Sequence, residues 1–323
     1  MADLPMPQPE SNEVLIAVSV CGVCHTELDQ IEGRISPMKL PVTLGHQVVG
    51  NIVQTGTDST KFRVGDRVGV GWIFAACGRC RFCTTGYENL CDAFKATGKD
   101  VDGGYAEYMT APENHVYPVP DFFSDAEAAP LFCAGAIGYR SLRLAQLKNG
   151  DRLGLTGFGA SASLVLQLVK HHYPDTEVFV FARKEGERQF ALELGASWAG
   201  DTATQAPEKL HSIIDTTPAW KPVVEALANL EKGGRLVINA IRKEEGDKAY
   251  LQQLSFHQHL WQEREIKSVA NITGKDISDF LELAARASIR PTVQQYLLED
   301  ANKALLELKE QKIRGSKVLK IHR

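Results

Sequence analysis

The first third of the chain alternates between short apolar runs and glycine-containing turns. The runs EVLIAVSV, QVVGNIV and DRVGVGW, at residues 13–20, 47–53 and 66–72, are rich in valine and isoleucine. Few positions in this region repeat with the 3.6-residue period of a helix. The pattern therefore predicts a β-rich domain.

From about residue 136 the pattern changes to strands that alternate with helices. Apolar runs predict strands at residues 152–157, 177–182, 212–217, 235–241 and 265–271. Between the first three strands, residues 163–172 and 187–196 carry apolar side chains at helical spacing and predict helices. Such alternation is typical of a parallel sheet with helices on both faces.

The end of the chain predicts a helix, a strand, a second helix and a second strand. These elements are expected at DISDFLELAARA, TVQQYLL, DANKALLELKEQKIRG and KVLKI. Periodicity alone leaves two possibilities open, because these elements could extend the second domain or return to the first.

Length and charge limit the classes of function. A chain of 323 residues is long enough for two domains. It carries 36 basic and 40 acidic side chains, a net charge of −4, so nucleic acid is not the expected partner. The sequence has neither an apolar run long enough to span a membrane nor the basic and apolar start of a signal peptide. We therefore expect a cytoplasmic protein without a membrane partner.

Four of the seven cysteines lie close together in CGRCRFCTTGYENLC, at residues 77–91. The spacing C-x2-C-x2-C-x7-C places four thiols on one short loop: Cys77, Cys80, Cys83 and Cys91. Four thiolates can close a tetrahedron around a structural zinc ion. An iron–sulfur cluster fits less well, because the last spacing is long and an aspartate, not a proline, follows the final cysteine.

A second metal site could combine Cys24, His46 and Cys133, which lie 22 and 87 residues apart along the chain. Three ligands from distant loops, with a fourth position left open, are what a catalytic zinc requires. Buried cysteines and a hydrogen-bonded turn histidine are the alternative interpretation. Spacing alone leaves both open.

Residues 157–162 read GFGASA, between an expected strand and an expected helix. This order matches a dinucleotide fingerprint. We expect Gly157 to make the tight turn, Gly159 to let the backbone approach a pyrophosphate, and Ala162 to allow close helix–strand packing. The helix N-terminus would supply N–H donors to the phosphates.

The end of the next strand predicts which dinucleotide is bound. An acidic residue there would favour NAD, but this chain has Ala182 followed by Arg183 and Lys184. A neutral residue followed by two basic ones suits the 2′-phosphate of NADP. We therefore favour NADP over NAD; alternatively, the basic pair is only a solvated loop.

Taken together, these motifs resemble the zinc-dependent alcohol dehydrogenases of the medium-chain dehydrogenase/reductase superfamily. The motifs follow the family's order: CGVCHTELD, LGHQVVG, the cysteine knuckle at 77–91, DGGYAEY, PLFCAG, GFGASA and KIRGSKVL. The resemblance implies an α/β fold with a GroES-like, β-rich catalytic domain formed by 1–135 and 272–323. A Rossmann domain with a doubly wound parallel sheet would occupy 136–271.

The resemblance also implies roles for single residues. Cys24, His46 and Cys133 would bind the catalytic zinc, so that the chain holds two zinc ions. Thr26 would pass the proton of the alcohol, and His25 would lie near the cofactor pyrophosphate. The residues implied in the wall of the substrate pocket are Trp72 and Ile73.

Three positions depart from the family pattern. Glu27 stands where the family usually has an aspartate that orients the ligand histidine, and it is one methylene longer. Gln47 replaces the usual acid after that histidine. Asp29 replaces a histidine that often ends the proton relay, so the proton could leave through Asp29 or directly to solvent.

The implied reaction is reversible hydride transfer between NAD or NADP and a primary alcohol or aldehyde held at zinc. The family implies a homodimer or homotetramer. A zinc-free quinone or enoyl reductase is disfavoured, because such relatives generally lack these ligands. A non-enzymatic zinc-knuckle module is disfavoured because Arg79 and Arg81 have acids nearby, and a relative that kept the fold without catalysis is a further alternative. The substrate and the physiological direction stay open.

Overall fold

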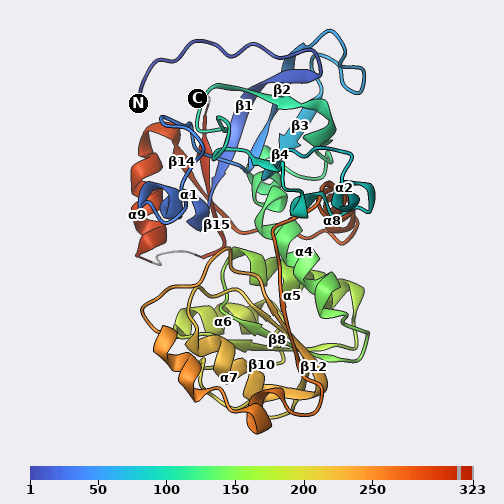
Figure 1. Ribbon diagram of the computed structural model, residues 1–323, viewed down its shortest axis with the longest axis vertical. Helices are drawn as coiled ribbons and strands as arrows, with labels where there is room; N and C mark the ends of the chain where they lie inside the picture. The colour runs from blue at the N-terminus through green and yellow to red at the C-terminus, as the bar shows by residue number, and fades with distance from the viewer. Residues whose placement is uncertain (311–313, 322–323) are drawn as a thin grey trace. The chain divides into compact units, whose positions relative to one another are not determined.

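The computed structural model describes residues 1–310 and 314–321, and the chain forms two compact units (Figure 1). The first unit combines Met1–Ala136 with Ile272–Arg323, and the second is Ile137–Asn271. The first unit therefore contains both ends of the chain, and the second is inserted between its two segments.

The sheet of the first unit has seven strands, and its neighbours are antiparallel except for one parallel pair. In spatial order the strands are β14 (Val293–Leu297), β15 (Ser316–Lys320), β1 (Glu13–Val23), β2 (Val48–Thr55), β3 (Arg67–Val70) and β7 (Val116–Pro118), and β6 (Tyr108–Pro112) also pairs with β1. A small separate sheet joins β4 (Ile73–Ala75) to β5 (Lys95–Ala96). Because β15 pairs with β1, the last strand of the chain returns to its first.

Alternation along the strands builds the core of the first unit. Val14, Ile16 and Val18 of β1 point to one face of the sheet and are buried. They pack in one cluster with apolar residues of β2, β3 and β6, including Ile52 and Met109. This rigid sheet holds the loops at its strand ends in fixed positions.

Short helices surround this sheet: α1 (His25–Ile31), α2 (Arg81–Thr84), α3 (Asp125–Ala128), α8 (Gly274–Arg286) and α9 (Ala301–Lys309), with 3-10 turns η1 (Glu88–Leu90), η2 (Glu113–His115), η3 (Ala129–Phe132) and η6 (Leu298–Asp300). A capping box starts α8, because the Thr273 hydroxyl accepts from the Asp276 N–H and the Asp276 carboxylate accepts from the Thr273 N–H. Helix α4 (Ala134–Ala145) begins in the first unit and continues in the second.

The second unit contains a six-stranded parallel sheet with helices on both sides (Figure 1). Its strand order is β10 (Trp198–Gly200), β9 (Glu177–Phe181), β8 (Arg152–Thr156), β11 (Leu210–Asp215), β12 (Leu230–Ile238) and β13 (Glu265–Ser268). The remaining elements are α5 (Ala160–His172), α6 (Glu185–Glu193), α7 (Lys221–Asn229), the 3-10 turn η4 (Lys248–Gln253) and the π-turn η5 (Phe256–Leu260). The strand order reverses between β8 and β11, which is the point where doubly wound sheets bind ligands.

The predicted alternation of strands and helices in the second unit is confirmed, with boundaries shifted by a few residues. Helices α1 to α4 and α7 were not predicted from the sequence, nor were the short strands β4 to β7 and β10. Helix α9 covers the first part of the helix expected over 300–315, and residues 311–313 of that expected helix lie outside the described residues.

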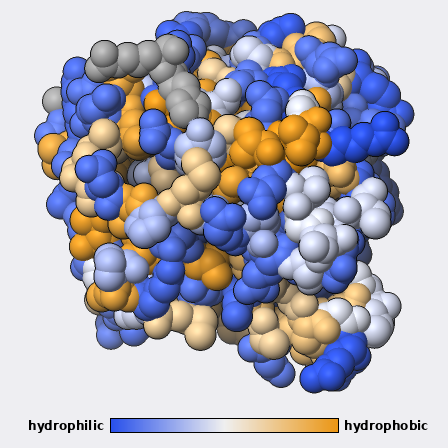
Figure 2. All heavy atoms as spheres, turned by 90° about the horizontal axis from the view of Figure 1, so that it is seen from above, coloured by the Kyte–Doolittle hydropathy of each residue, from blue (hydrophilic) through white to orange (hydrophobic). Residues whose placement is uncertain are grey.

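In the part of the chain that the structure describes, no helix is long and apolar enough to cross a membrane. On the face drawn in Figure 2, hydrophobic residues form separate groups among hydrophilic ones. Scattered exposed apolar side chains are normal on folded proteins.

Candidate functional site

Three loops of the first unit bring Cys24, His46 and Cys133 together. Cys24 follows β1 directly and His46 lies two residues before β2, and these strand ends are adjacent because Cys21 pairs with Val48. Cys133 lies between η3 and α4. The ligand atoms of the three residues lie within 4.8 Å of one another, and His46 Nε2 is 3.2 Å from Cys133 Sγ.

The carboxylate of Glu27 supports two of these residues at once. Its Oε1 lies 2.6 Å from His46 Nδ1, and its Oε2 accepts a hydrogen bond of 2.8 Å from the Cys24 backbone N–H. Nε2 of His46 is thereby directed toward the two sulfurs. A carboxylate behind a histidine is the usual support of a metal-ligating imidazole, and the longer side chain of glutamate reaches it here.

Burial and neighbouring charges shift the protonation of this group. Burial lowers the pKa of His46, but the Glu27 carboxylate and the Cys24 thiol outweigh it and raise this pKa to about 10. Burial raises the pKa of Glu27, and His46 opposes that shift. A hydrogen bond with Cys133 lowers the pKa of the Cys24 thiol, which favours the thiolate that binds metals.

The other residues expected at this site lie around it. Thr26 is buried, and its Oγ1 is 3.6 Å from Cys24 Sγ. The Trp72 ring is buried and meets the His46 ring edge-on, with 5.0 Å between the ring centroids. Ile73 is buried in the adjacent strand β4. His25 is exposed at the start of α1.

Two of the residues that depart from the family pattern, Gln47 and Asp29, make specific contacts with neighbouring residues. Gln47 is buried, and its side chain packs against Gly22, so closely that a Cβ built on Gly22 would lie 2.6 Å from the Gln47 amide oxygen. The Asp29 carboxylate forms an ion pair of 2.7 Å with Arg34 Nε. Asp29 is therefore held by a salt bridge on the helix that carries Thr26.

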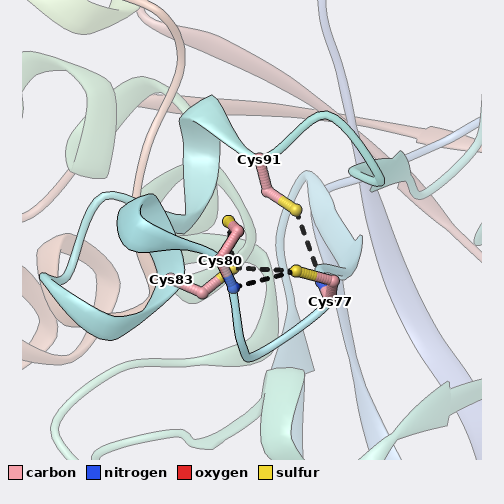
Figure 3. A group of neighbouring side chains, drawn as sticks. All are labelled: Cys77, Cys80, Cys83 and Cys91. Atoms are coloured by element: carbon pink, nitrogen blue, oxygen red, sulfur yellow. Dashed lines mark hydrogen bonds between the residues drawn. The ribbon is translucent and has the colours of Figure 1, made fainter.

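The knuckle residues Cys77, Cys80, Cys83 and Cys91 enclose one small volume, as Figure 3 shows. The Sγ atom of Cys83 lies 3.5 Å from that of Cys80 and 3.9 Å from that of Cys77. Backbone N–H groups of Arg79 and Cys80 lower the pKa of Cys77 to about 6, whereas burial raises the pKa of Cys83 to about 12. N–H groups that point at sulfur stabilise a thiolate.

Both clusters fit zinc by the chemistry of their donor sets. A tetrahedral ion with bonds of about 2.3 Å to sulfur separates its thiolates by roughly 3.8 Å, close to the distances in the knuckle. Among the described residues, the knuckle group offers four ligand side chains and the Cys24 group three. The first set can close a structural site, and the second leaves a coordination position for another ligand.

The glycine turn of the second unit has the expected geometry. Gly157 has a φ of 78°, and a Cβ built on it would lie 2.9 Å from Thr216 Oγ1 and from Thr217 Cγ2. A Cβ on Gly159 would meet nothing within 4 Å, so space is left beside the N-terminus of α5. Ala162 is fully buried where the helix packs on the sheet. This open glycine backbone fits a pyrophosphate.

The loop after β9 carries the residues expected to select the dinucleotide. Ala182 is buried, whereas Arg183 and Lys184 are exposed. Arg188, at the start of α6, donates to the carbonyls of Ala182 and Arg183 at 2.8 and 3.0 Å and fixes the path of the loop. Arg188 was not predicted from the sequence, although a basic residue one turn into the helix is a usable signal.

Comparison with known proteins places this chain in a family. Residues 10–121 match the protein family described as "Alcohol dehydrogenase GroES-like domain". The chain is 40% identical over 321 residues to "Probable alcohol dehydrogenase AdhA" of Mycobacterium tuberculosis, with 98% of this chain and 91% of that protein covered.

Solved structures agree with that match. The cinnamyl alcohol dehydrogenase SbCAD4 of Sorghum bicolor has a TM-score of 0.85 and 26% identity, over 98% of this chain and 92% of that one. A structure described as CAD from Helicobacter pylori complexed with NADP(H) has a TM-score of 0.85 and 25% identity, over 96% and 91%.

Fold and relatives define an oxidoreductase of the medium-chain dehydrogenase/reductase type. The chain belongs to the alcohol dehydrogenase family. The fold class predicted from the sequence and the family resemblance are thereby confirmed. The alternative of a non-enzymatic zinc-knuckle module is wrong, because the chain matches proteins named as alcohol dehydrogenases, and the match covers nearly the whole of both chains.

Proposed function

We propose that this chain is a zinc-dependent alcohol dehydrogenase or aldehyde reductase that transfers hydride reversibly between a primary alcohol or aldehyde and NAD(P). The observation that carries the proposal is the three-ligand cluster of Cys24, His46 and Cys133 with Glu27 behind the histidine. A zinc-free reductase of the same fold would not require this set of metal ligands.

The two metal clusters would take different roles. Cys77, Cys80, Cys83 and Cys91 would hold a structural zinc that stabilises the loop. Cys24, His46 and Cys133 would hold the catalytic zinc, which when bound polarises the oxygen of the alcohol or aldehyde. Glu27 would keep the His46 ring in place by accepting a hydrogen bond from Nδ1–H.

The protein's own groups would move the proton and exclude water. Thr26 Oγ1 is buried beside the Cys24 sulfur and would pass on the proton of the substrate hydroxyl, taking it up as its own hydroxyl proton leaves toward Asp29 or solvent. Trp72 and Ile73 would form an apolar wall beside the reacting carbon. Such a wall suits unbranched or aromatic substrates, and the Sorghum relative's name, cinnamyl alcohol dehydrogenase, points to an aromatic alcohol.

In the second unit, Gly157 would make the tight turn, Gly159 would let the backbone approach the pyrophosphate at the start of α5, and Ala162 would allow the close helix–strand packing. We favour NADP, because Arg183 and Lys184 follow the neutral Ala182 at the end of β9 and could pair with a 2′-phosphate. The Helicobacter structure is described as a complex with NADP(H). The nicotinamide of the bound dinucleotide supplies or accepts the hydride.

The decisive experiment compares initial rates of benzaldehyde reduction with NADPH and with NADH at equal concentration. A strong preference for NADPH, lost in the Arg183→Ala/Lys184→Ala variant, would support the 2′-phosphate site and a reductive role. Lys170→Ala is the control, because Lys170 lies in the last turn of α5, away from the glycine turn at its start. A preference for NADH would contradict the NADP assignment and favour alcohol oxidation.

A second comparison tests the metal. Cys24→Ala is expected to lose the metal of the three-ligand cluster and nearly all turnover while far-UV circular dichroism shows an unchanged fold. Wild-type turnover with one metal fewer per chain would contradict zinc-dependent catalysis.

A further inference from the structure

Lys243, in the loop after β12, has a largely buried side chain with a full set of partners. Its Nζ donates to the Asp215 carboxylate, to the Thr217 carbonyl at 2.7 Å and to the Ala219 carbonyl at 3.0 Å. The side chain of Lys243 is 8% exposed, and that of Asp215 is 0% exposed. An ammonium group has three protons to donate, and each of these contacts uses one.

These contacts join two loops at the carboxyl edge of the parallel sheet. Residues 216–220 follow β11, and residues 239–247 follow β12. The Glu244 N–H donates to the Pro218 carbonyl at 2.7 Å, and the Asp247 carboxylate accepts from the N–H groups of Trp220 and Lys221 where α7 begins. Lys243 lies in the middle of these contacts, and its charged Nζ donates to the carbonyls of Thr217 and Ala219.

The loop that Lys243 holds lies against the glycine turn. Thr216 donates to the Thr156 carbonyl through its N–H at 2.9 Å and through its hydroxyl at 3.0 Å. The side chains of Thr216 and Thr217 also fill the space next to Gly157, where a Cβ would lie 2.9 Å from each. The 216–220 loop and the glycine turn therefore lie together at the carboxyl ends of the paired strands β11 and β8, where the strand order reverses and ligands of such sheets bind.

Burying a lysine and an aspartate has a cost that hydrophobic residues of similar size would avoid. The Lys243–Asp215 pair is therefore better explained by its holding the 216–219 turn in place than by a gain in the stability of the fold. Asp215 anchors the ammonium group, and the ammonium group fixes two carbonyls that have no partner within a helix or a strand.

We propose that Lys243 is a positioning residue for the dinucleotide. It holds the 216–219 turn against the Gly157 turn, so that the crevice at the strand reversal keeps its shape before the dinucleotide arrives. The proposal rests on the proposed function, because it assumes that this crevice binds NAD(P). Lys243 acts through the turn and does not itself touch the dinucleotide.

The test uses the full-length protein and the Kd for NADPH and for NADH, measured by nucleotide fluorescence at a temperature where every variant is folded. Lys243→Met is expected to raise the Kd of the better-bound dinucleotide by roughly tenfold, the effect of losing hydrogen bonds from a charged donor. It should also speed hydrogen exchange in residues 216–220. Lys243→Arg, which keeps the charge and several donors, should recover part of the affinity.

Two further variants separate positioning from stability. Lys317→Met removes another buried lysine, which contacts Gln294, Tyr296 and Glu307 in the first unit, and should lower the melting temperature without changing the Kd. Lys243→Met leaves the buried Asp215 carboxylate without its partner and should lower the melting temperature. The double variant Asp215→Asn/Lys243→Met removes both charges and should restore the melting temperature but not the affinity for the dinucleotide. Recovery of both in the double variant would show that Lys243 only neutralises Asp215 and would overturn the proposal.

The remaining outcomes are also decisive. A wild-type Kd in Lys243→Met would overturn the role of Lys243 and leave the proposed function intact. Failure of the wild-type protein to bind NADPH and NADH would contradict the proposed function, and the role of Lys243 would fail with it.

Discussion

Nδ1 of His46 lies 2.6 Å from Oε1 of Glu27, and both side chains are buried. The other oxygen of the same carboxylate accepts from the Cys24 backbone N–H, so one side chain sets the position of two metal-ligand residues. Glu27→Gln keeps the shape of the side chain but removes its charge. We expect the affinity of the three-ligand cluster for zinc to fall by about 10- to 100-fold.

Metal content after timed dialysis against a chelator measures this effect. The knuckle at 77–91 provides an internal control, because its four cysteines form a cluster separate from the one that Glu27 supports, and its metal should be retained equally in both proteins. Equal retention of both metals in wild type and Glu27→Gln would show that the carboxylate does not support the site.

Cys83→Ala tests the second cluster. The sulfur of Cys83 lies within 4 Å of two others, and its loss leaves three thiols and an incomplete tetrahedron. We expect loss of the knuckle metal and a lower melting temperature, because a structural zinc contributes its binding free energy to local folding. The matched variant Cys24→Ala should lose the other metal with a smaller change in melting temperature. An unchanged melting temperature and metal content in Cys83→Ala would rule out a structural zinc.

The sequence predicts most of the parallel sheet because its strands and helices differ in period. It does not predict α1, because seven residues inside a β-rich region give too short a helical pattern. One signal was available: Glu27 is the third residue of that helix, and its carboxylate accepts from the N–H of Cys24 as in a capping box.

The candidate metal sites differ in how far local sequence could predict them. The knuckle has its four ligands in one short motif, whereas Cys24, His46 and Cys133 meet only because paired strands bring distant loops together. Lys243 and Asp215 lie 28 residues apart in separate loops, and no spacing rule joins them. Their contact follows from the neighbouring positions of β11 and β12 in the sheet.

Glu113 predicts a pH dependence of stability. Its Oε2 accepts from the N–H groups of Lys61 and Thr60 and from the Ser59 hydroxyl, and these hydrogen bonds lower the pKa of Glu113. A carboxyl whose pKa is lower in the folded state stabilises the fold above its unfolded pKa, about 4.3, and loses this contribution as the pH falls through the folded value. The free-energy difference between wild type and Glu113→Gln should therefore be constant near neutral pH and shrink below about pH 4.3.

Urea unfolding of both proteins at pH 7, 5, 4 and 3 measures that difference. Glu107→Gln, at an exposed position of the same unit, is the control and should show little difference at any of these values. A difference between wild type and Glu113→Gln that stays the same down to pH 3 would mean that the loop contacts do not depend on the ionised carboxylate.

Glu88 connects the knuckle to a helix that lies 186 residues further along the chain. Its Oε1 accepts a hydrogen bond of 2.7 Å from the N–H of Gly274, the first residue of α8. A carboxylate at a helix N-terminus satisfies an N–H that has no partner within the helix. Helix α8 in turn packs on η3, which ends directly before Cys133, and Phe280 of α8 fills the space next to Gly135.

Glu88→Ala is therefore expected to affect both metal clusters, the knuckle directly and the Cys24 cluster through α8 and η3. We predict a loss of about 1 kcal/mol in the free energy of unfolding, the usual value of a lost helix cap, and faster removal of the Cys24-cluster metal by chelator. Glu88→Gln, which keeps an acceptor, should be milder, and Glu282→Ala, on the exposed face of α8, should have no effect on metal removal. If Glu88→Ala released only the knuckle metal faster, α8 would not connect the two clusters, and Cys133 would be held by η3 and α4 alone.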